Sequence, residues 1–395
     1  MLNRINRSFL VASLGGALLC SAGAAADALT AAIVSGKASG DIRIRYEDVS
    51  SGSNDSDGIT IRTRLGYTTA SYEGFSATVE FEDVRDMFGI DDEKGFIPDN
   101  EVTELDQGFL QYKGDKFTAK LGRQVIAIDG HRHVGHVGWR QDRQTFDAAR
   151  VTMMPLDKLT VDLSYIYRRN GINGSGLDIP NAAFQTVNLA YAMPAGKLVG
   201  YSYLISQEGG IDETDTYGVS FSGKTKGDIP FLYAVEYATQ ENVTKNVDTD
   251  YTFVELGVTV SGVTGKLGYE VLGSDTNGGV TENFSTPLAT VHKFQGWADQ
   301  FLGGSVTGTI NGGNGVEDKY LSVTTKWSGI KWLAVYHDYD ADQGSADLGD
   351  ELNLLAAKKF AKNYSAGLKY ADYNAGDSGT GTDTEKLWFW LGMKF

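Results

Sequence analysis

The chain has 395 residues, a formal net charge of −16 and a hydrophobic content of 41%. The acidic balance excludes nucleic-acid binding by neutralisation of phosphates, and the hydrophobic content excludes an intrinsically disordered chain. Its 49 glycines, 20 tyrosines and 18 phenylalanines, against only 6 prolines, agree with a β-barrel.

The first 26 residues have the pattern of a secretory signal peptide. Arg4 and Arg7 supply a basic start, residues 9–19 an apolar run, and Ala24-Ala25-Ala26 a cleavage site before Asp27. The apolar run is too short to cross a membrane as a helix, and no run of 18 apolar residues follows it. We therefore expect residues 1–26 to be removed and residues 27–395 to form a single domain.

Cleavage would also remove Cys20, the single cysteine of the chain. The mature protein is then expected to have no disulfide and no thiol chemistry. Lipidation of Cys20 is not expected, because Leu19 stands where a lipidation signal requires a small residue. We also expect no bound cofactor.

Eighteen runs of about ten residues alternate between apolar and polar positions, as membrane-spanning β-strands do. They lie near residues 39–47, 59–70, 75–85, 105–113, 116–125, 146–153, 159–168, 185–192, 197–205, 215–223, 230–239, 251–261, 263–273, 318–327, 330–339, 351–360, 364–373 and 386–395.

The connections between these runs alternate in length. Tight turns such as 113–115 and 261–262 follow the even-numbered runs, and long loops such as 86–104 and 274–317 follow the odd-numbered ones. This asymmetry predicts an all-β, antiparallel up-and-down barrel of about 18 strands in a Gram-negative outer membrane. The even strand number predicts both termini in the periplasm and the long loops outside the cell.

The end of the chain supports the barrel. Apolar residues stand at every second position of the last nine residues: Leu387, Phe389, Leu391, Met393 and Phe395. This pattern is expected for a last strand that pairs with the first and faces lipid. The terminal Phe395 resembles the assembly signal of outer-membrane proteins. The expected partners are therefore the barrel-assembly machinery, outer-membrane lipid and lipopolysaccharide.

The alternation also predicts which side chains face the lumen. Charges on the lipid face are costly, so Arg43, Arg45, Arg62 and Arg64 are assigned inward. The same reasoning directs Lys120, Arg150, Asp162 and Arg168 inward. Arg123 has the opposite parity and is expected at the rim or after a bulge.

Every arginine lies at or before Arg169, whereas Glu236, Glu255 and Glu270 are expected to face inward on later strands. This predicts an arginine-rich wall opposite a more acidic one. Arginine suits carboxylate or phosphate groups of a solute, because its guanidinium is planar and permanently charged. The alternative is structural pairing, and the carboxylates available for it are Asp41, Glu80, Glu82 and Asp162.

Two loops are unusual. Residues 122–147 contain three histidines, Trp139 and three candidate solute contacts: Arg132, Arg140 and Arg143. His131, His133 and His136 could bind a metal, but a folded-in, hydrogen-bonded loop is the default, and we expect no metal.

The second loop, residues 286–302, is rich in aromatic side chains that would be a liability if exposed to water. We expect it to fold into the barrel mouth as a constriction or lid, with a group of candidate residues: His292, Phe294, Trp297, Asp299 and Phe301. A third loop, Asp91-Asp92-Glu93, could bind Ca²⁺ or cations that bridge lipopolysaccharide, although a solvated loop is the simpler interpretation.

Five segments resemble the alginate export family of outer-membrane porins: residues 41–47, residues 60–67, the GRQ…DGHR…GWRQ…QTFDA segment, residues 286–302, and residues 317–321. The resemblance implies a monomeric 18-stranded barrel that conducts an anionic polysaccharide. It gives that role to arginines in the matching segments: Arg43, Arg45, Arg62, Arg64, Arg123, Arg140 and Arg150. The chain differs from this family pattern because it has no arginine after Arg169. Its arginines are therefore not expected to form a continuous ring of positive charge.

These observations favour a porin that passes a hydrophilic, anionic solute such as a sugar acid, an oligosaccharide or a polysaccharide. Two alternatives stay open. One is a non-conducting structural or adhesive barrel with a plugged lumen. The other is an outer-membrane hydrolase, which is disfavoured because no Ser-His-acid grouping is present at a strand rim.

Overall fold

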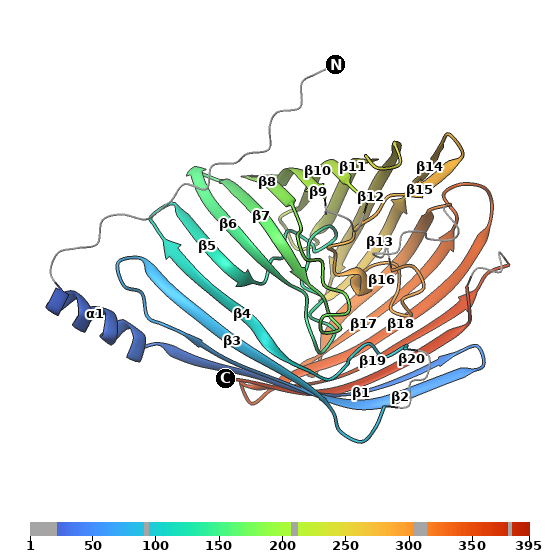
Figure 1. Cartoon of the computed structure of the whole chain (residues 1–395). Coiled ribbons are helices and arrows are strands. Elements are labelled where there is room, and N and C mark those ends of the chain that lie inside the picture. The colour runs from blue at the N-terminus through green and yellow to red at the C-terminus, as the bar shows by residue number, and fades with distance from the viewer. Residues whose placement is uncertain (1–21, 91–94, 207–211, 303–313, 378–380) are drawn as a thin grey trace, which may run out of the picture.

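The computed structural model describes residues 22–90, 95–206, 212–302, 314–377 and 381–395. Residues 1–21 and the Asp91–Glu93 segment lie outside the described residues. A helix, α1 (Ala22–Val34), spans the expected cleavage site and joins the first strand of a closed 18-stranded antiparallel sheet (Figure 1). No described helix is long and apolar enough to cross a membrane.

The barrel is an up-and-down meander in which each strand pairs with its neighbours in sequence. Its strands are β1 (Lys37–Ser51), β2 (Asn54–Thr68), β3 (Phe75–Asp86), β4 (Val102–Lys113), β5 (Phe117–Gln124), β6 (Thr145–Leu156), β7 (Leu159–Asn170), β8 (Phe184–Met193), β9 (Gly196–Ile205), β10 (Thr214–Lys224), β11 (Phe231–Asn242), β12 (Val247–Val260), β13 (Val263–Leu272), β16 (Val316–Trp327), β17 (Ile330–Asp340), β18 (Asp347–Phe360), β19 (Tyr364–Ala375) and β20 (Thr384–Lys394). Each of the 18 expected runs corresponds to one of these strands, so the predicted fold is confirmed.

The first and last strands close the barrel. β1 and β20 pair from Asp41 opposite Lys394 to Ser51 opposite Thr384. Phe395 extends the pairing, because its backbone N–H and C=O both bond to Gly40 at 3.0 Å. A Cβ atom at Gly40 would lie 2.3 Å from the Phe395 ring, so only glycine lets the terminal ring pack here.

The two ends of the barrel differ. We call the end that carries residues 87–90, 95–101, 125–144 and 273–302 the loop end, and the end that carries residues 157–158 and 261–262 the turn end. The expected asymmetry holds with one exception. A long loop was expected after the first strand, but β1 and β2 stay paired up to a turn at Gly52 and Ser53. Apart from the buried Val49, this part of both strands is polar on both faces, so the apolar alternation stops before the backbone pairing does.

Tyrosines mark the border of the apolar outer face near the loop end. Tyr46, Tyr237 and Tyr269 each donate a hydrogen bond from their hydroxyl toward a carboxylate closer to that end, at 2.8–3.1 Å. An amphipathic ring with its polar tip directed away from the apolar band is the arrangement expected at a membrane–water interface.

Another hairpin, β14 (Ser274–Asn277) paired with β15 (Val280–Asn283), stands outside the barrel sheet. It belongs to the long connection between β13 and β16, and the alternation analysis did not predict it. Its four-residue strands are too short to produce a recognisable repeat.

Candidate functional site

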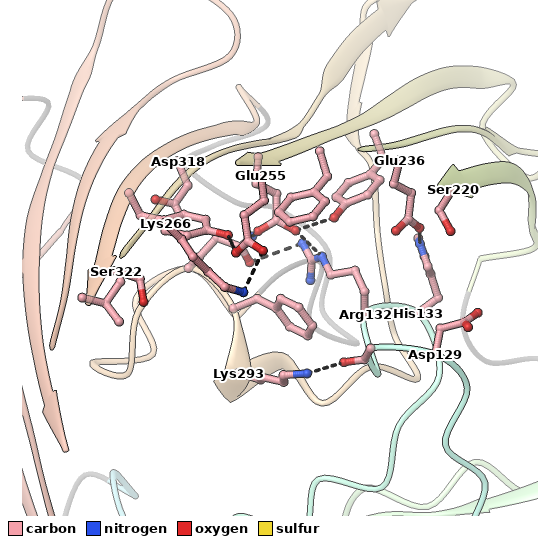
Figure 2. Close-up of a pocket in the computed structure, with 18 of the residues that line it drawn as sticks. Asp129, Arg132, His133, Ser220, Glu236, Glu255, Lys266, Lys293, Asp318 and Ser322 are labelled. Carbon is pink, nitrogen blue, oxygen red and sulfur yellow. Dashed lines mark hydrogen bonds and ion pairs between the residues drawn. The ribbon is translucent and has the colours of Figure 1, made fainter. Parts of the chain in front are cut away.

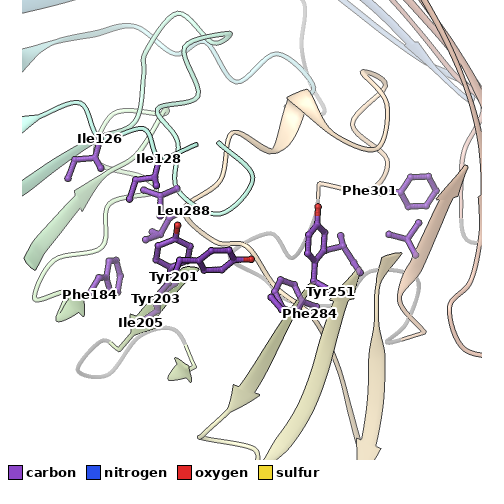
Figure 3. Packing of buried hydrophobic residues seen from close by; sticks show 14 of the residues in the cluster. Ile126, Ile128, Phe184, Tyr201, Tyr203, Ile205, Tyr251, Phe284, Leu288 and Phe301 are labelled. Atoms are coloured by element: carbon purple, nitrogen blue, oxygen red, sulfur yellow. The ribbon is translucent and has the colours of Figure 1, made fainter. Parts of the chain in front are cut away.

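Residues 125–144, between β5 and β6, fold into the barrel, and we call them the first inward loop (Figure 1). Ile126 and Val134 are almost fully buried in it. Ile126 and Ile128 belong to a hydrophobic cluster that also includes Tyr203 of the wall (Figure 3). The apolar residues of this loop therefore fix it to the inner wall by burial.

Residues 284–302, between β15 and β16, form the second inward loop. Its Phe284, Leu288 and Phe301 are buried in the same cluster (Figure 3). The two loops are bonded to each other: Val134 and Leu288 form a parallel bridge, and Gly135 donates its N–H to the Leu288 carbonyl at 2.8 Å. The second loop thus lies inside the barrel, where the sequence predicted a constriction or lid.

Side chains of the barrel wall hold the second loop by accepting hydrogen bonds from its backbone N–H groups. The Glu351 carboxylate on β18 accepts the N–H of Ala298 at 2.8 Å, and Asn353 accepts the N–H of Trp297 at 3.0 Å. Gly296 has φ +80°, and a Cβ there would lie 2.1 Å from a Glu351 oxygen. The Gln-Gly-Trp sequence therefore places glycine where the backbone must approach the strand closely.

Three aromatic side chains from three segments surround the ammonium of Lys369 on β19. Its Nζ lies 4.2 Å, 3.8 Å and 5.2 Å from the ring centroids of Trp139, Trp297 and Trp388. It also lies 2.6 Å from His292 Nε2. Cation–π attraction of this kind is strongest when the pair is desolvated, and Lys369 is buried.

His292 connects this group to Asp299. His292 Nδ1 lies 2.6 Å from Asp299 Oδ1, and Lys386 Nζ lies 2.9 Å from Asp299 Oδ2. Burial is the main cause that lowers the pKa of His292 to about 3, and Lys369 acts in the same direction, against the opposing effect of Asp299. A neutral imidazole fits the contacts, because its Nε2 accepts from an ammonium while its Nδ1–H donates to a carboxylate.

The predicted arginine wall faces inward but is paired. Its ion pairs join Arg45 to Glu47 and Asp99, Arg62 to Asp41, Arg64 to Glu82, Arg140 to Glu47, Arg143 to Glu80 and Asp106, and Arg150 to Asp162. Arg43 donates to the backbone carbonyls of Trp139 and Arg140 at 2.7 and 2.6 Å. These residues thus have partners of the kind that the structural-pairing alternative requires, and solute contact by them stays a prediction.

Two arginines lie elsewhere. Arg123 is on the outer face near the loop end, paired with Asp147 at 2.8 Å, as its parity predicted. Arg168 was assigned inward, but a bulge in β7 places it opposite Asp147 and beside Asp178. The extra residue reverses the alternation, so that Arg169 faces inward and is buried.

Lys120 lies where it was predicted, on the inner face of β5 opposite Arg150. Its Nζ is 4.5 Å from the ring centroid of Phe109.

Glu270 on β13 holds both inward loops. Its carboxylate accepts a hydrogen bond from Gln295 of the second loop and lies 2.7 Å from the Nε of Arg132 in the first loop. It also accepts the Tyr251 hydroxyl at 2.6 Å. Because Glu270 is only 3% exposed, these three partners compensate a charge that would be costly alone.

A cavity of about 460 Å³ lies between the first inward loop and the strands from β9 to β17 (Figure 2). It is lined by Arg132, Lys266 and Lys293, by the predicted acidic residues Glu236, Glu255 and Glu270, and by rings that include Tyr201, Phe253 and Phe294. The predicted acidic wall is therefore present, but Arg132 is the one arginine in this lining.

The three histidines of the first loop do not converge. His131 and His136 have ring centroids 5.0 Å apart, whereas His133 points to Glu236 at 2.8 Å. No group of three or more His, Cys, Asp or Glu residues suited to a metal is present in the described part of the chain. Burial, with smaller effects of His131 and Arg143, lowers the pKa of His136 to about 4.

Sequence reasoning missed the wall residues that receive the second loop, namely Lys369, Lys386 and Glu351. All three are buried inward residues of strands that it identified, so the strand alternation contained the signal. Their role could not be predicted, because nothing in the alternation indicates which wall a loop will contact.

Comparisons with known proteins agree with this architecture. The barrel is similar to OccAB2 of Acinetobacter baumannii, at 12% identity and a TM-score of 0.72, covering 92% of this chain and 99% of that one. It is also similar to OccD3 (OpdP) of Pseudomonas aeruginosa, at 13% identity and a TM-score of 0.70, covering 93% and 92%. OpdK of the same organism, in a structure with vanillate, gives 12% identity, a TM-score of 0.70 and coverage of 92% and 99%.

At such low identities these similarities establish the fold, an outer-membrane porin barrel. No curated protein sequence matches the chain. The family model described as "Alginate export" matches residues 38–272, which is more than half of the chain. The chain therefore belongs to the alginate export family.

Proposed function

We propose that the protein is an outer-membrane channel that passes a hydrophilic, anionic solute. In this proposal both termini are periplasmic, the loop end faces the outside of the cell and the mature chain acts as a monomer. The even number of strands and the different lengths of the two sets of connections support this orientation.

The polar cavity inside the barrel carries the proposal. A structural barrel has no need of a lumenal cavity that combines Arg132, Lys266 and Lys293 with hydrogen-bonding groups, whereas channels use such groups for selectivity. The structure of OpdK with vanillate adds support, because vanillate is an organic anion and OpdK has the same barrel fold as this chain. Anion contact is proposed at the cavity first, because Lys293 has no carboxylate partner among the described residues, whereas most arginines of the wall are paired with carboxylates.

The experiment is ion conductance in a planar bilayer, with the reversal potential measured in a salt gradient. We expect discrete channel openings with a preference for anions or only weak cation selectivity, although the chain is acidic overall. Exposed carboxylates of the loops are screened within about 8 Å at physiological salt, whereas groups in the lumen act at close range. Strong cation selectivity would contradict the anionic solute.

The buried cluster favours a second candidate, a barrel with a structural or adhesive role. Phe284, Leu288 and Phe301 of the second loop pack with wall residues such as Tyr339, as a permanent plug would. A folded protein that stays electrically silent in the bilayer would support this candidate and contradict the channel.

A further inference from the structure

The carboxylates that line the cavity have little capacity left to accept hydrogen bonds from a solute (Figure 2). Glu255 accepts from Lys266 and from the Tyr320 hydroxyl, both at 2.8 Å. Asp318 contacts His337 with both oxygens, at 2.9 and 3.0 Å. Protein donors thus already use the acidic side of the cavity, and it offers few acceptors to a hydroxyl-rich ligand.

One of the two carboxylate oxygens of Glu236 is occupied in the same way. Its Oε1 accepts the Tyr201 hydroxyl at 2.6 Å and lies 2.8 Å from His133 Nε2.

The unused hydrogen-bonding groups are donors. Arg132 is 5% exposed, and its Nη1 has no hydrogen-bond partner among the described residues. Its guanidinium carbon lies 5.4 Å and 4.7 Å from the ring centroids of Tyr251 and Phe294, which hold the group in place. A buried donor without a partner is costly, so a ligand oxygen at this position would be strongly favoured.

Lys293 is the second free donor. Its Nζ donates to the Gly130 carbonyl at 2.7 Å, and no ion pair with a carboxylate is present for it in the described ranges. Lys293 and Arg132 belong to different inward loops that both line the cavity (Figure 2). Both cations lie near the ring of Phe294, with the Arg132 guanidinium carbon 4.7 Å and the Lys293 Nζ 5.4 Å from its centroid.

Most of the remaining lining is apolar, and the exceptions include the hydroxyls of Ser220 and Ser322. Ile128, Phe253, Leu333 and Val335 face the cavity together with the rings of Tyr201 and Phe294. Each sugar hydroxyl placed against such a surface without a partner would lose about 1–3 kcal/mol of hydrogen bonding to water. A flat aromatic ring would instead bury apolar surface and stack on the rings.

We propose that the cavity binds an aromatic carboxylate of one or two rings, with its carboxylate on Arg132 and Lys293 and its ring against the apolar lining. The inference rests on the proposed channel function and identifies the solute class within it. The cavity volume of about 460 Å³ falls in the range of small-molecule sites, roughly 300–1,000 Å³.

The test is calorimetric titration of the folded full barrel in detergent with 4-hydroxybenzoate, benzyl alcohol and glucuronate. We expect 4-hydroxybenzoate to bind at least about tenfold more tightly than the other two, because benzyl alcohol lacks the charge and glucuronate lacks the apolar ring. Arg132→Gln should weaken 4-hydroxybenzoate binding by roughly ten- to hundredfold. Arg85→Gln is the matched control, because Arg85 is exposed and pairs with Asp83, outside the cavity lining.

Equal binding of glucuronate and 4-hydroxybenzoate would overturn the proposal, and so would unchanged affinity in Arg132→Gln. Arg132 also contacts Glu270, so its variant could fail to fold. Lys293→Gln breaks no ion pair and loses only a bond to a backbone carbonyl and a contact with the Phe294 ring. It should still weaken binding severalfold, and unchanged affinity there would also overturn the proposal. Conductance of the same preparation separates the proposed channel function from the proposed binding of aromatic carboxylates. A barrel that conducts ions but does not bind 4-hydroxybenzoate contradicts the binding proposal alone. A barrel that does not conduct contradicts the channel function.

Discussion

A buried guanidinium is stable only with a partner. Arg64 is 4% exposed and pairs with Glu82, which is fully buried, and it donates to the Gln141 carbonyl at 3.0 Å. Removing one member of such a pair leaves the other charge uncompensated, at a cost of about 3–5 kcal/mol. Arg64 of β2, together with Arg43 and Arg45 of β1, therefore holds the first inward loop against the wall by hydrogen bonds to the loop carbonyls.

We predict that Arg64→Ala lowers the free energy of unfolding by about 3–5 kcal/mol, measured by denaturant titration in lipid vesicles. The double variant Arg64→Ala/Glu82→Ala should lose less stability than the two single variants added together, because neither charge of the pair is then left buried without its partner. Arg85→Ala removes an exposed ion pair and should have little effect. Similar effects of Arg64→Ala and Arg85→Ala would contradict the structural role of Arg64.

His136 should make docking of the first inward loop depend on pH. Its pKa is lowered from 6.5 to about 4 by burial, so a released loop takes up a proton more readily than a docked one. The contribution of His136 to docking is therefore fully present above about pH 6.5 and is lost progressively as the pH falls from 6.5 to about 4. Conductance should rise over this range, and His136→Gln should reduce the change. An identical pH profile in the variant would refute the role of His136.

At the scale of elements, the two inward loops decide how much of the lumen is open. The second loop is bonded to the first loop on one side and to β18, β19 and β20 on the other. It also covers Lys369, which has no carboxylate partner within ion-pair distance among the described residues.

Deleting residues 286–302 should raise the single-channel conductance, because the buried aromatic groups of this segment leave the lumen. Anion preference should rise as well, since Lys369 and Lys386 lose their cover and Arg140 loses its contact with Asp299. Deletion of residues 275–282 is the control, because the β14–β15 hairpin stands outside the barrel sheet. Unchanged conductance after the first deletion would place the loop outside the conduction path.

The last strand depends on its final residue. Phe395 adds two backbone hydrogen bonds to Gly40, and its ring packs over that glycine. Deleting Phe395 should lower the amount of protein assembled in the outer membrane, measured by heat-modifiable migration of the folded barrel. Phe395→Tyr keeps the ring and should assemble normally. Normal assembly without residue 395 would rule out its role as an assembly signal.

The strands could be predicted from sequence because lipid on one side and water on the other impose an alternation with period two. The alternation gives no signal where that contrast ends. It did not predict the paired extension of β1 and β2, and the bulge in β7 exchanged the faces of Arg168 and Arg169. It identified the arginine wall but could not choose between solute and carboxylate partners, because the choice depends on where the first inward loop folds.

For the whole molecule, the unequal ends predict one orientation in the membrane. Peptide tags inserted at residues 343–347, at the loop end, should be accessible to antibody on intact cells, and tags at residues 113–115 should not. Both tags should be accessible after the outer membrane is permeabilised, which controls for expression. Accessibility of the 113–115 tag on intact cells would reverse the proposed orientation.

Glu270 makes the two inward loops interdependent. One carboxylate receives Arg132 from the first loop and Gln295 from the second, so the departure of either loop removes part of what stabilises the other. The shared carboxylate couples the docking of the two loops, and the coupling free energy is the same whichever loop undocks first. The loops should therefore undock as a cooperative unit, with a single conductance step between the closed and open levels in place of two independent sublevels.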